Sequence, residues 1–112
     1  MDDRTLKRID ILRHELKALR YLLDASHSGR PDRSAIPPRE DFISESSHLI
    51  YDAIVQAPDR AQAERRLLAL DLEDVDIESF LRLSGEHYYT YPALVRERAA
   101  ALRSGRLRIE AA

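Results

Sequence analysis

The sequence predicts an all-α fold, a compact bundle of about five helices with a long N-terminal helix. Apolar residues recur at helical spacing in several stretches, and loop signals separate these stretches. The β-branched residues are scattered rather than gathered into alternating runs, which disfavours a sheet. The chain has 112 residues, 44% of them hydrophobic, which suffices for a single helical domain, 1–112, with a modest core.

The longest predicted helix covers residues 1–25. Its main apolar residues step by three and four positions, as in a heptad seam, and are Ile9, Leu12, Leu16, Leu19 and Leu23. Further apolar residues widen this face, so the helix carries more hydrophobic surface than one side of a small domain needs: Leu6, Ile11 and Leu22. We therefore predict self-association through the five seam residues, most simply as a homodimer. The alternative is a monomer in which the extra residues pack against the following loop.

That loop is predicted at 26–38, because its glycine, three prolines and three serines do not continue a helix. The helical core is expected at 39–105. Its first helix carries one apolar stripe, formed by Ile50, Ala53, Ile54 and Ala57. Hydroxyl side chains just upstream are expected to cap this helix: Ser44, Ser46 and Ser47.

Two shorter helices should follow. One covers 59–70, with Pro58 suited to its first position. After an acidic connector, the other covers 77–84, with Asp76 as its cap and Gly85 as a left-handed stop.

The last predicted helix begins at Tyr91, has Pro92 in its first turn and ends at Gly105. Residues 106–112 are expected to form a frayed tail. The predicted core consists of Leu16, Leu19, Leu23, Phe42, Ile50, Ile54, Leu68, Phe80, Leu81, Val95 and Leu102.

Residues that could carry catalysis are scarce. The three glycines are too far apart for a phosphate-binding loop, and no two of the four histidines stand at metal-ligand spacing. Cysteine is absent, which excludes disulfides and thiolate sites. We therefore expect no enzymatic activity, no cofactor and no metal. The apolar runs are too short for a membrane span or a signal peptide, which makes the cytoplasm the default location.

Charge is segregated along the chain. Residues 40–86 carry four basic and twelve acidic side chains, whereas 87–112 carry five basic and two acidic ones. Aromatic and basic residues near the C-terminal end suggest the alternative function, a small nucleic-acid-binding protein that would use Tyr88, Tyr89, Arg96, Arg98 and Arg103. The acidic middle argues against this alternative, because it repels phosphate.

Two segments resemble the helical N-terminal domain of DnaB-type replicative DNA helicases. The first match consists of Asp41-Phe42, His48, Ile50-Tyr51 and Ala53-Ile54. The second consists of Tyr91, Val95, Arg96, Glu97 and Arg98. The leucines of the opening helix, Leu19, Leu22 and Leu23, are also similar to the family's, and the likeness extends over about residues 15–103. The acidic connector departs from the family, which usually has a Gly-Gly there.

The resemblance implies an interaction role rather than unwinding. The family's ATPase domain is not expected to accompany the sequence, so its activity does not carry over. What the resemblance implies is self-association and docking of replication proteins. We therefore expect a non-enzymatic protein-protein interaction module that scaffolds or regulates DNA replication, with a replicative helicase, primase or loader protein as possible partner and no membrane association.

Overall fold

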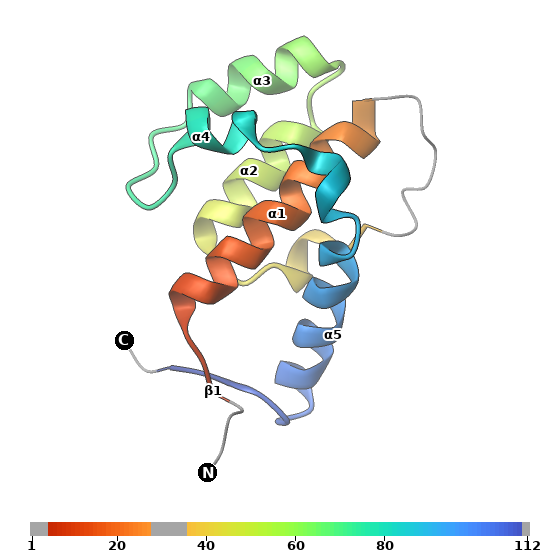
Figure 1. Cartoon of the computed structure of the whole chain (residues 1–112). Coiled ribbons are helices and arrows are strands. Elements are labelled where there is room, and N and C mark those ends of the chain that lie inside the picture. The colour runs from red at the N-terminus through yellow and green to blue at the C-terminus, as the bar shows by residue number, and fades with distance from the viewer. Residues whose placement is uncertain (1–4, 28–35, 111–112) are drawn as a thin grey trace.

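The computed structural model describes residues 5–27 and 36–110, and it confirms the all-α prediction (Figure 1). The α-helices are α1 (Arg8–His27), α2 (Glu45–Val55), α3 (Arg60–Leu68), α4 (Ile77–Arg82) and α5 (Tyr91–Arg103). In the described part of the chain, the 3-10 helices η2 (Arg39–Asp41) and η3 (Gly85–Tyr88) precede α2 and α5. Two short strands, β1 (Thr5–Leu6) and β2 (Arg108–Ile109), form a parallel pair.

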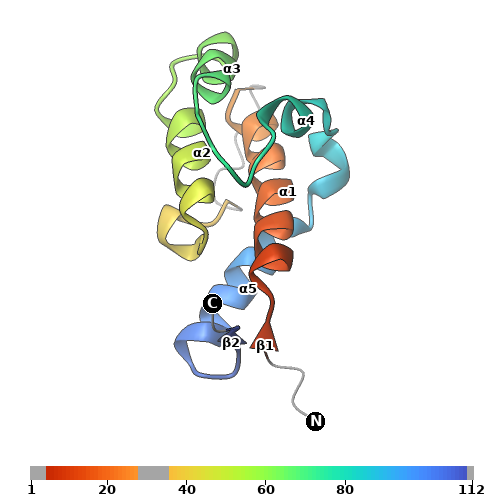
Figure 2. The ribbon, with the colours of Figure 1, turned by 90° about the vertical axis from the view of Figure 1, so that its left-hand side faces the viewer.

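Helix α1 is the centre of the bundle. It packs against α2, α5 and η3, and both views show it between α2 and η3 (Figures 1 and 2). Because neighbours cover it from several sides, a wide apolar face is buried within the domain: Ile11, Leu12, Leu19, Leu22 and Leu23. The width of this face therefore reflects a central position in the fold, and it is not evidence of surplus surface. The loop expected to cover it lies mostly outside the described residues.

The segment before α2 anchors that helix to the core. Phe42 is almost fully buried, and its ring lies 5.5 Å from the ring of Tyr51, one and a half turns into α2. Ile50 and Ile54 are completely buried on the inner side of α2. These three predicted core residues are confirmed.

Helices α3 and α4 begin at aspartate caps. Asp59 accepts a hydrogen bond from the backbone N–H of Gln62 at 2.8 Å, so α3 begins at Arg60, after Pro58 rather than at it. Asp76 accepts from the N–H groups of Glu78 and Ser79, which confirms the predicted cap of α4. In both places a carboxylate satisfies N–H groups that a helix start leaves without partners.

Some predicted core residues lie further out. Leu68 is 54% exposed, so its assignment to the core is wrong. Leu67 takes the inward position on α3, and a neighbouring residue on a helix points about 100° away from it. Leu16 and Leu81 are partly buried against the core, and Leu102 is half-buried.

Gly85 does not end α4 in the left-handed conformation, so that prediction is wrong. It begins η3 and lies against α1, where an added Cβ would be 2.8 Å from the carbonyl oxygen of Arg20. Gly105 is the described residue with positive φ, at 79°, which confirms the predicted stop of α5.

The segment after Gly105 is not frayed over its described part. Thr5 pairs with Arg108 and Leu6 with Ile109, and the N–H of Glu110 donates to the carbonyl of Leu6 at 2.9 Å. Pairing between segments about a hundred residues apart leaves no local signal in the sequence. Figure 2 shows the two strands side by side below α5.

Candidate functional site

The cap of α2 comes from α1. Glu15 is buried, and its carboxylate accepts hydrogen bonds from the backbone N–H groups of Ile43 at 2.6 Å and Ser44 at 3.1 Å and from the Ser47 hydroxyl at 2.8 Å. Ser44 occupies the cap position but makes no side-chain cap bond. Ser46 donates instead to Asp74. The expectation that the three serines cap this helix is therefore wrong.

A cleft of about 320 Å³ opens beside this junction. Its apolar wall consists of Ile9, Ile11, Leu12 and Ile43. Polar and charged residues complete the lining: Arg8, Ser44, Glu45 and Asp74. An apolar cleft with a charged border is the usual form of a small protein-binding surface.

The structure separates the five predicted self-association residues. Leu12, Leu19 and Leu23 lie in the core, and Leu16 packs against it. Ile9 is 53% exposed and borders the cleft, and Leu12 also contributes to the cleft wall. The five residues therefore form no common exposed stripe, and Ile9 is the member that is available to a partner.

The predicted nucleic-acid residues also do not form one surface. Arg96 donates to the carbonyl of Ile36 at 2.7 Å, Arg103 contacts Asp41 at 3.1 Å, and Arg98 is buried. The Tyr88 ring stacks edge-on against Tyr91, and the Lys17 ammonium lies over both rings, while Tyr89 is exposed. Most of these groups have structural roles within the fold.

Arg98 and His14 form a polar contact between α5 and α1. Arg98 donates from Nη2 to His14 Nδ1 at 2.7 Å, which requires an unprotonated Nδ1. Burial lowers the pKa of His14 below its ordinary 6.5, and the charges of Arg98 and Lys17 lower it further, against a raising effect of Asp10. Burial also lowers the pKa of Arg98, although the nearby carboxylates of Glu15 and Asp10 oppose this shift.

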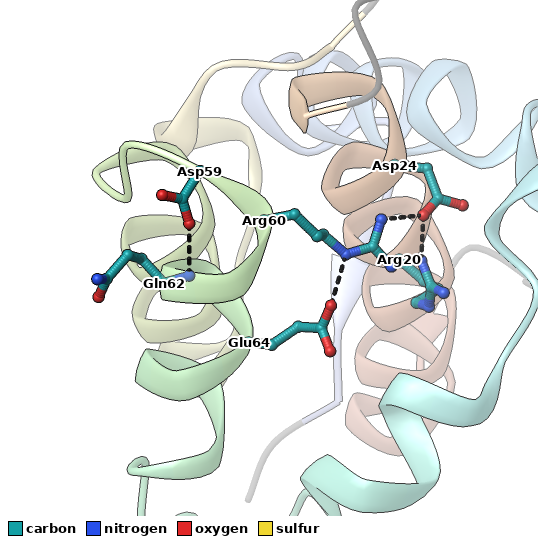
Figure 3. A network of polar contacts seen from close by, with 6 residues as sticks. All are labelled: Arg20, Asp24, Asp59, Arg60, Gln62 and Glu64. Atoms are coloured by element: carbon teal, nitrogen blue, oxygen red, sulfur yellow. Dashed lines mark hydrogen bonds and ion pairs between the residues drawn. The ribbon is translucent and has the colours of Figure 1, made fainter.

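A second polar network holds α3 on α1 (Figure 3). Asp24 accepts from Arg20 at 2.8 Å on its own helix and from Arg60 at 2.9 Å on α3. Arg60 also pairs with Glu64, one turn further along α3, at 3.0 Å. The partly exposed carboxylate of Asp24 thus joins two helices.

Sequence reasoning missed Glu15, His14 and the burial of Arg98, although a signal existed. Glu15 lies three residues after Leu12 and four before Leu19, and Arg98 lies three after Val95 and four before Leu102. A charged residue at those spacings shares the apolar side of its helix. Such a residue must find a polar partner inside the fold.

The described residues provide no group of three or more histidine and acidic side chains placed to hold a metal ion. Within residues 5–27 and 36–110, no helix has the length and apolar character to cross a membrane.

Comparison with known proteins identifies no relative. No family model matches the chain, and neither the curated proteins nor the solved structures give a significant match.

Proposed function

We propose that this chain is a non-enzymatic protein-protein interaction module that pairs with a second copy through the cleft at the start of α1. The observation that carries the proposal is Ile9, a large apolar side chain that is 53% exposed at the border of an apolar cleft. Water contact at such a residue is unfavourable, and burial in a partner's cleft removes it.

Charges around the cleft support a second copy as the occupant. The lining includes Arg8 at the start of α1, Glu45 at the start of α2 and Asp74 in the connector before α4. In a twofold dimer the cleft of one protomer faces the same cleft of the other. Arg8 of each protomer can then approach an acidic residue of its partner, and each Ile9 can enter the partner's cleft. A surface that carries both signs of charge can therefore be complementary to a second copy of itself.

The proposal extends to replication proteins because of the resemblance to the helicase N-terminal domain. A homodimer of this kind would dock on a replicative helicase, primase or loader protein in the cytoplasm. The match at Asp41-Phe42 and Ile50–Ile54 coincides with the segment that anchors α2 to the core.

Sedimentation equilibrium tests the dimer. We expect a mass near twice 12.9 kDa at high micromolar concentration, and a return to 12.9 kDa for Ile9→Glu with the helical circular dichroism signal retained. Leu68→Glu is the matched control, because Leu68 is 54% exposed on α3, a helix that contacts α1 near its C-terminal end through Asp24, whereas Ile9 lies in the first turn of α1. A monomeric wild-type chain, or equal effects of the two variants, would contradict the proposed interface.

The partner is tested by mixing the purified chain with replicative helicase, primase and loader protein, one at a time. Size-exclusion chromatography should show a complex with one of them at physiological salt, and retention on single-stranded DNA should be absent. Retention on DNA without any protein complex would favour the nucleic-acid function instead.

A further inference from the structure

A second cavity, of about 460 Å³, lies between β1, α5 and the turn that leads to β2. Its apolar wall consists of Leu6, Leu94, Ala101 and Leu107. Three charged residues complete the lining: Glu97, Arg98 and Arg106. Pockets that bind small molecules are commonly about 300–1,000 Å³ and combine apolar walls with a few polar groups.

Arg98 is the unusual member of this lining. The residue is 7% exposed, one terminal nitrogen donates to His14, and the other, Nη1, is buried with no hydrogen-bond partner. Among the described residues no ion pair joins Arg98 to a carboxylate. A buried guanidinium without an anion is costly, because burial removes its hydration and the hydrogen bond to His14 replaces only part of it.

The internal carboxylate that influences the charge of Arg98 most is already bound to other groups. Glu15 influences Arg98 through its charge, but its oxygens accept from Ile43, Ser44 and Ser47. Arg98 contributes to the cavity lining, and although Nη1 is covered by protein atoms, a small shift of the side chain would let an anion in the cavity contact it. Arg106, exposed in the turn after α5, adds a second positive charge to the lining.

We propose that this cavity binds a small organic carboxylate with an apolar body. The carboxylate group pairs with Arg98, and the hydrocarbon part packs against the four apolar residues of the wall. A planar carboxylate matches the fork of a guanidinium. A single negative charge suits the lining better than a phosphate dianion, because Glu97 repels a second charge.

The competing explanation is that Arg98 is purely structural, with its charge balanced at longer range by Glu15 and Asp10. In that case the cavity would have no preference for an anion over a neutral molecule of the same shape. The two explanations therefore differ in ligand selectivity.

Hexanoate and hexanamide are suitable probes, because they share the hydrocarbon chain and differ in charge. Titration followed by calorimetry and two-dimensional NMR should show saturable hexanoate binding with a Kd on the order of 1 mM, a strength suited to so small a ligand. NMR shifts should cluster at Leu94, Ala101 and Leu107. Hexanamide should bind at least about tenfold more weakly.

Two variants locate the charge. Arg98→Gln should abolish the preference for hexanoate, and Arg106→Gln, at an exposed position that leaves the fold intact, should weaken hexanoate binding several-fold. Arg108→Gln is the matched control, since Arg108 is exposed on β2 and outside the lining. If Arg98→Gln does not fold, the hexanoate affinity of Arg106→Gln is the measurement that tests the proposal. Equal affinity for the two probes, no saturation, or hexanoate binding that Arg106→Gln leaves unchanged would overturn the proposal.

Discussion

Glu15 in α1 and Ser47 in α2 are 32 residues apart in the chain and share a buried hydrogen bond of 2.8 Å. The same carboxylate accepts the backbone N–H groups of Ile43 and Ser44 just before α2 begins. A negative charge at a helix N-terminus also interacts favourably with the helix dipole. One side chain therefore fixes both the start of α2 and its position against α1.

Replacement of Glu15 should destabilise the fold more than replacement of a carboxylate at the surface. Glu15→Gln keeps the shape but loses the charge and turns one acceptor into a donor that faces N–H groups. We expect a loss of about 2–4 kcal/mol in the free energy of unfolding, measured by urea denaturation. Glu64→Gln is the control, because Glu64 makes a partly exposed pair with Arg60 and should cost less than about 1 kcal/mol. Similar losses of unfolding free energy in Glu15→Gln and Glu64→Gln would show that Glu15 does not hold α2 in place.

Stability should depend on pH through His14. Its pKa in the folded state is lowered from 6.5, so above pH 6.5 both states keep a neutral imidazole and stability is unaffected. As the pH falls below 6.5, the unfolded chain takes up a proton that the folded one refuses, and stability decreases until the folded pKa is reached. Protonation of Nδ1 also breaks the contact with Arg98.

The measurement is the urea midpoint of wild type and His14→Gln between pH 7.5 and pH 5. The decrease on acidification should be smaller in the variant, whereas His87→Gln, at an exposed position, should follow the wild type. An identical pH dependence in His14→Gln and wild type would show that His14 makes no contribution.

Gly85 should not tolerate a larger residue, because of space and not of backbone conformation. A Cβ there would collide with the Asp24 carboxylate and lie 2.8 Å from the Arg20 carbonyl, which belongs to the backbone of α1. We expect Gly85→Ala to cost about 1–3 kcal/mol in unfolding free energy, as overpacking usually does. Ser84→Ala, one residue earlier and exposed, should change it by less than about 0.5 kcal/mol. If Gly85→Ala leaves the free energy of unfolding unchanged, η3 can move away from α1 at little cost, which would contradict this prediction.

Local signals in the sequence predicted the helices well. Asp76, Pro92 and Gly105 act within a few residues of where they stand, so their positions mark the ends of α4 and α5 directly. Two of the wrong predictions depended on contacts between distant segments. Gly85 is needed by α1, and the segment after Gly105 pairs with β1.

The site was harder to predict for the same reason. The periodicity of apolar residues identified the apolar side of α1 but not the elements that pack against it. The predicted seam therefore combined residues that are buried in the core with a residue that is exposed at the surface. Leu12 and Ile9 belong to the same pattern, yet Leu12 is 6% exposed and Ile9 is 53% exposed. The difference depends on which neighbouring elements pack on each position of α1 in the folded chain. A linear pattern does not contain that information.

Truncation of a large apolar side chain to alanine should lower the free energy of unfolding much more at a buried position than at an exposed one. Ile54 is completely buried and Phe42 is 2% exposed, so we expect Ile54→Ala and Phe42→Ala each to cost about 2–5 kcal/mol in unfolding free energy. Leu68→Ala removes a side chain of similar size that is 54% exposed, and should cost less than about 1 kcal/mol. Urea denaturation of the three variants tests this contrast directly. A loss under about 0.5 kcal/mol for both Phe42→Ala and Ile54→Ala would exclude them from the core. A large loss of unfolding free energy for Leu68→Ala would instead show that the Leu68 side chain is buried in solution. Because Leu68 lies on α3, it would then be buried by a surface other than the cleft at Ile9.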